Sequence, residues 1–241
     1  MRVGAYIDGY NLYYGGRGIC GRGTAGWRWL DLRRLLTDVV CRESGWGSVE
    51  HLHVVFCTAR VREAGQSQHD QDAYLRALKR SGSANIIEYG KYVSRCATAP
   101  LAVAGRRGRP QITQSAWPVQ VRNSEDHDVP GATFMVSIAR REEKGSDVNV
   151  AAHLLHDVLT GAVEAAVVVS NDSDLKLPVQ IAKERVPVGV VNPTKGHPAR
   201  DLSGAPGAGV GGHWWYQLTV PDFIGAQLPT VVGTLRKPAG W

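Results

Sequence analysis

The sequence is poor in cysteine and has no pair of cysteines at metal-ligand spacing. Four cysteines are scattered among its 241 residues, at Cys20, Cys41, Cys57 and Cys96. This scatter argues against a structural zinc site and against a dense disulfide framework. No apolar run approaches the roughly 20 residues of a membrane-spanning helix, and no basic segment followed by an apolar stretch marks a secretory signal peptide. We therefore expect a cytoplasmic protein with no membrane partner.

The composition is that of an ordinary globular protein with a basic balance. Hydrophobic residues make up 43% of the chain and charged residues 21%, and the length fits one α/β domain with an extension. The net charge of +6 suits a polyanionic partner, because neutralised phosphates dominate nucleic-acid affinity. Many basic proteins bind no nucleic acid, so the charge alone decides little. Homo-oligomer formation is left open.

The first half of the chain alternates between strand and helix patterns. Apolar runs typical of buried strands occur at 3–7, 51–58 and 84–89. Amphipathic patterns predict helices over 31–41, with Asp31 as the N-cap, and over 69–80. The glycine-rich stretch 15–26 is predicted to be a loop. This order predicts a three-layer α/β/α sandwich with a central, mainly parallel sheet.

The second half contains an irregular stretch and then a further α/β pattern. From 96 to 130 the periodicity dissolves, which we interpret as an irregular insertion, either a β-hairpin or a mobile flap. A regular pattern returns at 134–138, strands are expected at 165–169 and 187–191, and helices are expected at 146–159 and 174–185. After Pro193 the composition shifts. We therefore expect a domain over 1–193 and a Gly/Pro-rich linker with a C-terminal tail over 194–241.

Four carboxylates occupy positions where ligands bind in open α/β sheets. Asp8 follows the first strand, Asp172 and Asp174 follow the strand at 165–169, and Asp147 lies in the first turn of the preceding helix. If the first and fourth strands are neighbours, the four acids converge outside the carboxyl ends of the strands. A divalent cation such as Mg²⁺ or Mn²⁺ would then relieve their repulsion. Taken singly, each acid fits a turn or a helix cap equally well.

Three segments resemble the signature blocks of NYN domains, which belong to the PIN-like nuclease superfamily. They are YIDGYNL at 6–12, KGSDVN at 144–149 and VSNDSDL at 169–175. The stretch 71–78 is also similar to the second-helix block of the family, and the whole resemblance covers about 3–193. It implies a PIN-like, Rossmann-like fold and metal-dependent RNA cleavage. The irregular stretch 96–130 follows no pattern of the family.

The resemblance implies both a chemistry and a set of residues. The expected enzyme is a metal-dependent nuclease, most simply an (endo)ribonuclease of single-stranded RNA, in which Mg²⁺ or Mn²⁺ activates a water molecule. The residues that match the acidic metal-binding positions are Asp8, Asp147, Asp172 and Asp174, and Asn11 is the polar residue expected to complete the catalytic set. The alternatives are a non-catalytic nucleic-acid or protein-binding module and a small-molecule phosphatase.

Two further patterns are weighed and set aside. Gly207, Gly209 and Gly212 spell GxGxxG, but a dinucleotide fingerprint must follow a strand and open a helix. Ser170 lacks the GxSxG context of a hydrolase nucleophile. Neither pattern therefore predicts a site.

Overall fold

A computed structural model describes the chain except residues 62–64, 107–108, 114–120, 198, 200–201 and 203. The chain divides into two compact units, one formed by Met1–Tyr92 with Glu143–Trp241 and the other by Val93–Glu142. In chain order the elements are β1 (Arg2–Asp8), α1 (Gly9–Cys20), α2 (Leu32–Glu43), β2 (His51–Ala59), α3 (Gln66–Ser81), β3 (Ile86–Pro100), β4 (Ala102–Ala104), β5 (Pro110–Ile112), β6 (Met135–Lys144), α4 (Ser146–Leu159), β7 (Ala165–Val169), the 3₁₀ turn η2 (Ser173–Leu175), α5 (Lys176–Lys183), β8 (Val188–Asn192), β9 (Trp214–Gln217), α7 (Val220–Gly225), β10 (Val231–Val232) and β11 (Leu235–Arg236).

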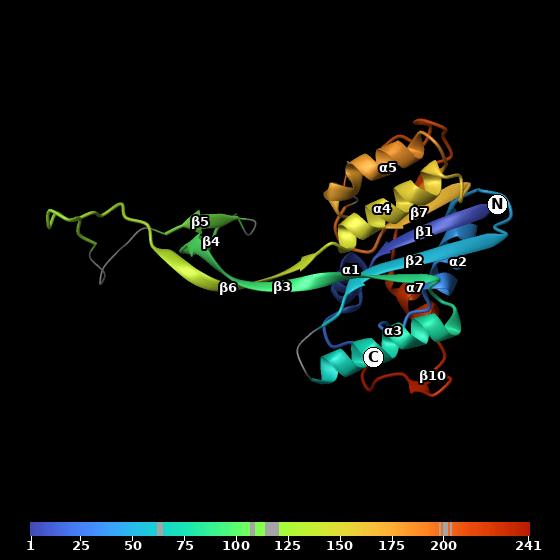
Figure 1. Ribbon diagram of the computed structural model, residues 1–241, viewed down its shortest axis with the longest axis horizontal. Coiled ribbons are helices and arrows are strands. Elements are labelled where there is room, and N and C mark those ends of the chain that lie inside the picture. The colour runs from blue at the N-terminus through green and yellow to red at the C-terminus, as the bar shows by residue number, and fades with distance from the viewer. Residues whose placement is uncertain (62–64, 107–108, 114–120, 198, 200–201, 203) are drawn as a thin grey trace. The chain divides into compact units, whose positions relative to one another are not determined.

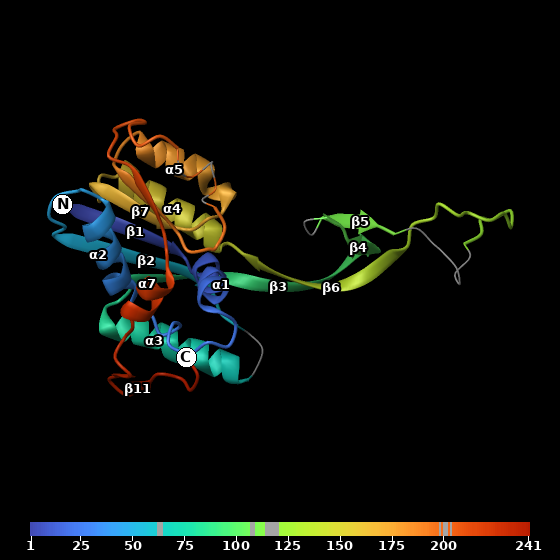
Figure 2. The same cartoon turned by 180° about the vertical axis from the view of Figure 1, so that it is seen from behind.

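A seven-stranded sheet in the order β6-β3-β2-β1-β7-β8-β9 forms the centre of the fold. The pairs β3–β2, β2–β1, β1–β7, β7–β8 and β8–β9 are all parallel. Helices α4 and α5 cover one face of the sheet, and α1, α2, α3 and α7 cover the other (Figures 1 and 2). The predicted three-layer α/β/α sandwich is confirmed.

Strand β1 shows why this sheet is buried on both faces. Side chains alternate across a strand, so Val3, Ala5 and Ile7 join the apolar cluster under α1, α2 and α3. Tyr6 points to the opposite cluster under α4 and α5, where its hydroxyl donates to Asp157 Oδ2 at 2.9 Å. A central parallel strand therefore appears in the sequence as a continuous apolar run.

Helix α1 starts immediately after β1, and the predicted loop over 15–26 is wrong for its first six residues. Asp8 caps the helix, because its side chain accepts a hydrogen bond from Asn11 N. Gly15 lies against the backbone of Pro193, and Gly16 lies against the rings of Phe223 and Trp27. These glycines let the helix approach its neighbours closely, which a pattern of local residue preferences does not reveal.

Helices α2 and α3 follow the amphipathic patterns of the sequence. Asp31 accepts a hydrogen bond from Arg34 N at 3.2 Å, so its predicted N-cap role is confirmed. The apolar face of α2 is buried through Leu32, Leu35, Leu36, Val39 and Val40. Among the described residues, no helix combines the length and the apolar character needed to cross a bilayer.

The second unit, Val93–Glu142, is built around antiparallel strands. Strands β4 and β5 pair with Ala102 opposite Ile112, and the outer parts of β3 and β6 belong to the same unit. The sequence interpretation of this region included a β-hairpin, and the β4–β5 pair agrees with it. The predicted boundaries of 96 and 130 are narrower than those of the unit.

The segment after Pro193, expected as a linker and tail, contributes packed elements to the first unit. Strand β9 extends the sheet beside β8, and Phe223 of α7 is fully buried. Trp214 is also buried, whereas Trp215 is partly exposed. The Gly-rich turns after residue 203 therefore lead to an ordered strand, β9, and Val210 N donates a hydrogen bond to the carbonyl of Lys183 in α5.

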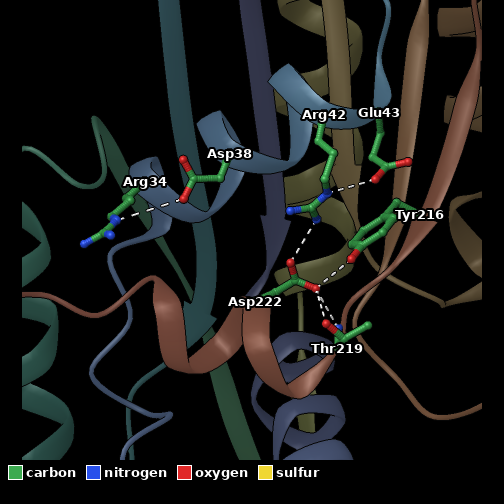
Figure 3. Close-up of polar contacts among 7 residues, drawn as sticks. All are labelled: Arg34, Asp38, Arg42, Glu43, Tyr216, Thr219 and Asp222. Carbon is green, nitrogen blue, oxygen red and sulfur yellow. Dashed lines mark hydrogen bonds and ion pairs between the residues drawn. The ribbon is translucent and has the colours of Figure 1, made fainter.

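The carboxylate of Asp222 in α7 binds Arg42 of α2 and so links the two helices (Figure 3). Asp222 accepts hydrogen bonds from Arg42 Nη2 at 2.9 Å, from the Tyr216 hydroxyl at 2.8 Å, and from the Thr219 side chain and backbone at 2.7 and 2.8 Å. The Arg42 guanidinium also lies over the Tyr216 ring. Burial raises the pKa of Asp222, but these hydrogen bonds outweigh burial and hold the pKa below its usual value.

We expect Asp222→Asn to lower the free energy of unfolding by about 1–3 kcal/mol at neutral pH, because hydrogen bonds to a charged group are lost. A depressed carboxyl pKa stabilises the fold above the ordinary carboxyl range, so the difference should shrink as the pH falls through the pKa of the folded state. Urea unfolding at several pH values measures it. Asp38→Asn is the matched control, since Asp38 forms an exposed pair with Arg34 at 4.0 Å. An equal effect of both substitutions would contradict the prediction.

Candidate active site

Asp8 is the buried carboxylate at the carboxyl end of β1, only 4% exposed. Its Oδ1 accepts from Asn11 N at 2.9 Å, and its Oδ2 accepts from the Ser170 hydroxyl at 3.2 Å. Burial raises the pKa of Asp8 to about 6 against the opposing effect of those two hydrogen bonds, and the charges of Asp172 and Glu143 raise it further. The carboxyl group can therefore gain or lose a proton near neutral pH.

The residues after β7 form hydrogen bonds with Asp8 and Asn11 at the start of α1, because β1 and β7 are parallel neighbours, the condition on which the expected convergence of the acids depended. The fully buried Ser170 donates to Asp8 and accepts from Asp172 N at 3.1 Å. Asn171 N donates to Asn11 Oδ1 at 3.1 Å. Ser170 and Asn171 were not predicted as site residues. Their position directly after a buried strand was the signal that could have identified them.

The other predicted acids have local roles. Asp172 accepts a hydrogen bond from Asp174 N at 3.1 Å and so caps η2. Asp174 is exposed, and Asp147 lies in the first turn of α4. Of these three, only Asp172 is among the charges that act on Asp8. In the part of the chain that the structure describes, no three His, Cys, Asp or Glu side chains form a group that could hold a metal ion.

Glu143 is an acid of this region that the sequence did not identify. Its Oε1 accepts from the Ser146 hydroxyl at 2.7 Å and from Ser146 N at 3.3 Å, which caps the start of α4. Gly90 permits this approach, because a Cβ there would lie 2.5 Å from Glu143 Oε1. In the sequence, an acidic residue three positions before the serine that begins a helix was the signal that could have identified Glu143.

A cavity of about 450 Å³ lies between α1, the end of β2, α3 and the C-terminal residues, and Asp8 is not among the described residues that line it. Gly9, the residue after Asp8, is part of its wall. The aromatic residues of the wall are Tyr10, Tyr13, Tyr14, Phe56, Tyr74, Tyr92 and Trp241. Such a volume and such walls suit a planar small molecule.

The tyrosines of α1 form one aromatic face of the cavity. Tyr10, Tyr13 and Tyr14 are spaced i, i+3, i+4, which places them on one side of a helix. The Tyr10 and Tyr14 ring centroids are 4.4 Å apart, and those of Tyr13 and Tyr14 are 5.2 Å apart. Elsewhere in the wall, the centroids of Tyr74 and Trp241 are 5.7 Å apart. The sequence pattern predicted no helix directly after the first strand, so this face was not anticipated.

Arg28 supplies a positive charge to the cavity wall. Its guanidinium lies over the Trp27 ring, 5.0 Å from the centroid, and its Nη1 donates to the Gly240 carbonyl at 2.9 Å. Its Nε is buried and finds no acceptor among the described residues. Gln71, also in the wall, has its amide engaged by the backbone of Val61 and Ala59.

Among known proteins, a monooxygenase resembles this chain along its whole length. No protein-family model matches the sequence. The protein that resembles this chain is the 6-hydroxy-3-succinoylpyridine 3-monooxygenase HspA of Pseudomonas putida. It is 29% identical over 264 residues, an alignment that covers 100% of this chain and 75% of HspA. A solved protein of unknown function from Vibrio parahaemolyticus aligns with 92% of this chain and 94% of its own chain at 13% identity, with a TM-score of 0.45.

The predicted metal-dependent nuclease is therefore wrong. A protein similar to the whole chain is named an oxidoreductase, not a hydrolase of phosphodiester bonds. The predicted Mg²⁺ or Mn²⁺ cofactor is wrong as well, because the acids that were expected to bind it do not form a metal-holding group within the described residues. Asp174 is exposed, and Asp147 belongs to the first turn of α4. A part in catalysis for these acids and for Asn11 remains a prediction.

Proposed function

We propose that the protein is a monooxygenase that hydroxylates a hydroxylated aromatic ring of the pyridine class. The observation that carries this proposal is the aromatic-walled cavity of about 450 Å³, whose wall includes Gly9, the residue that follows the buried Asp8. Stacked tyrosine and tryptophan rings favour a flat ring through offset and edge-to-face contacts. The printed name of HspA, whose substrate is a hydroxypyridine, supports the same substrate class.

The reaction requires two co-reactants besides the ring. One oxygen atom of dioxygen replaces a ring hydrogen as a hydroxyl group, and the other leaves as water. The two electrons come from a donor of the reduced nicotinamide or reduced flavin class, and two protons complete the water. The chain must hold the ring, exclude bulk water and handle protons.

Asp8 is the group best suited to exchange a proton in this site. A general base works most effectively when its pKa lies near the working pH, and burial raises the pKa of Asp8 to about 6. Asp8 precedes Gly9 of the cavity wall in the sequence, and its charge adds to the larger effect of burial in raising the pKa of Tyr10, another residue of the wall. Loss of the proton from a ring hydroxyl would increase electron density at the ring carbons ortho and para to it, and position 3 in the name of HspA is para to the 6-hydroxyl group.

We name only the class of the electron donor. Two features that often bind the phosphate groups of such donors do not have the required structure here. The GxGxxG segment ends at Gly212, just before β9, and opens no helix. The N-terminus of α1, which would attract a phosphate in many α/β proteins, is already capped by the Asp8 carboxylate. A second negative charge there would be repelled.

The proposal is tested by incubating the protein with 6-hydroxy-3-succinoylpyridine, NADH and isotopically labelled dioxygen, with and without added flavin. We expect a product that carries one labelled oxygen atom, formed in step with NADH oxidation. Heat-denatured protein and an oxygen-free reaction are the controls. Absence of labelled product while NADH is consumed, or a product oxygen that comes from water, would overturn the proposal.

Three predictions from the sequence remain proposals. Membership of the NYN family rests on the three segments that resemble its blocks. A single-stranded RNA partner rests on the net charge of +6 and that resemblance, and filter binding at two salt concentrations would test it. A cytoplasmic location is supported by the four cysteines, all of which are free.

A further inference from the structure

We infer that Arg28 binds a carboxylate, so the ligand of the cavity is an aromatic acid. This inference rests on the proposed function, because it specifies the substrate class of the same cavity. Arg28 is held in place by a backbone carbonyl and an aromatic ring. Its Nη1 donates to the Gly240 carbonyl, and its guanidinium lies over Trp27.

The Nε–H of Arg28 is left without an acceptor in a buried position. Among the described residues it has no hydrogen-bond partner, and a buried donor without a partner is costly to the fold. In a guanidinium, Nε and Nη2 form one edge that can bind both oxygens of a carboxylate. Since Nη1 is engaged by Gly240, Nε and Nη2 are the donors left for an anionic ligand, which would reach the buried Nε after a shift of the side chain.

The other residues of the cavity wall determine which groups besides the carboxylate the ligand carries. Tyr13, Tyr14 and Trp241 provide rings against which an aromatic ring can stack. Asp70 is the acidic residue of the wall, and its Oδ1 accepts from Gln66 Nε2 at 2.6 Å. A ligand with a flat ring and a carboxylate some distance from it satisfies both the aromatic walls and Arg28. Of the charges in the wall, Arg28 is therefore the one that determines specificity for an acid.

Binding can be measured without turnover, in the absence of oxygen and of an electron donor. Isothermal titration calorimetry compares 6-hydroxy-3-succinoylpyridine with its primary amide, which has the same shape but no negative charge. We expect the wild-type protein to bind the acid about ten-fold or more tightly than the amide, as for a charge-assisted pair of hydrogen bonds. Equal affinity for the two probes, or no binding of the acid, would overturn the inference without any variant.

Arg28→Met removes the charge and keeps most of the apolar stem. We expect this variant to lose the preference for the acid while its affinity for the amide changes less than about two-fold. Arg22→Met is the matched control, because Arg22 is exposed in the loop after α1, and it should bind like the wild type. A preference that persists in Arg28→Met, or disappears in Arg22→Met, contradicts the inference.

The binding result and the activity result separate the two proposals. An acid that binds through Arg28 but is never hydroxylated would leave this inference standing and remove the monooxygenase. Hydroxylation with no preference for the acid over the amide would do the reverse. Circular dichroism of each variant shows whether a lost preference reflects a lost fold.

Discussion

Gly15→Ala is expected to lower the free energy of unfolding by about 3 kcal/mol, as for an added methyl group that a packed core cannot accommodate. A Cβ at this position would lie 2.2 Å from the carbonyl oxygen of Pro193 and 2.7 Å from its carbonyl carbon. Both atoms belong to the backbone, so relief requires α1 to move away from the segment after β8. Urea unfolding followed by circular dichroism measures the change.

Gly18→Ala is the matched control within the same helix. A Cβ at Gly18 would meet nothing within 4 Å, so the substitution should stabilise the protein by about 0.5–1 kcal/mol through helix propensity alone. The two variants therefore shift the unfolding midpoint in opposite directions. Shifts of the same sign would show that helix propensity, not the contact with Pro193, governs this helix.

The same displacement should reach the cavity. Helix α1 carries Tyr10, Tyr13 and Tyr14 on its cavity face, so a helix that moves away from Pro193 carries these rings with it. At a temperature where Gly15→Ala is still folded, the affinity for an aromatic acid should fall, whereas Gly18→Ala should retain it. Calorimetric titration of both variants checks this outcome.

Much of the fold could be predicted because apolar periodicity reports burial directly. The runs that become β1 and β7 are apolar without interruption, since each is covered by helices on both faces. Asp31 begins α2 with a side-chain cap, which is a local interaction between residues three apart. Such signals do not depend on the rest of the chain.

Helix α1 and the cavity could not be predicted, because they depend on contacts between distant segments. Gly15 and Gly16 weaken a helix locally, and only their contacts with Pro193, Trp27 and Phe223 explain them. The cavity combines residues as far apart in the sequence as Gly9 and Trp241. No local pattern contains that information.

The predicted acidic residues show a second limit of what a sequence can predict. The sequence placed Asp8 and Asp172 at adjacent strand ends, and the charge of Asp172 does act on Asp8. Yet an aspartate that caps a helix and an aspartate that binds a metal occupy the same kind of position. Asp172 caps η2, so position alone could not assign a chemistry to the group.

Asp8→Asn is expected to stabilise the protein at pH 7 and to abolish most of its activity. The pKa of Asp8 is raised from 3.8 to about 6, mainly by burial. At about 1.4 kcal/mol for each pKa unit, the ionised group costs the fold up to about 3 kcal/mol at pH 7. Asparagine can still accept the hydrogen bond from Asn11 N, so the helix cap is retained.

The raised pKa of Asp8 determines how the effect of Asp8→Asn on stability changes with pH. Between about pH 4 and pH 6 the folded protein holds a proton on Asp8 that the unfolded chain has released. This difference makes the contribution of Asp8 to stability fall as the pH rises through that window. Asp8→Asn removes that slope, so the variant should gain stability over the wild type as the pH rises from 4 to 6 and keep the gain above it. Urea unfolding at pH 4, 5, 6 and 7 tests this expectation.

Activity should move in the opposite direction from stability. An amide cannot accept the proton of a ring hydroxyl, so ring hydroxylation should fall by about 100-fold or more, the usual contribution of a general base. Asp38→Asn, at an exposed position on α2, should change neither quantity. A residue that costs stability at neutral pH and is required for turnover is what a trade-off between stability and function predicts. An Asp8→Asn variant with full activity would reduce Asp8 to a helix cap, and one that is less stable at pH 7 would show that the hydrogen bond from Ser170 outweighs the cost of burying the charge.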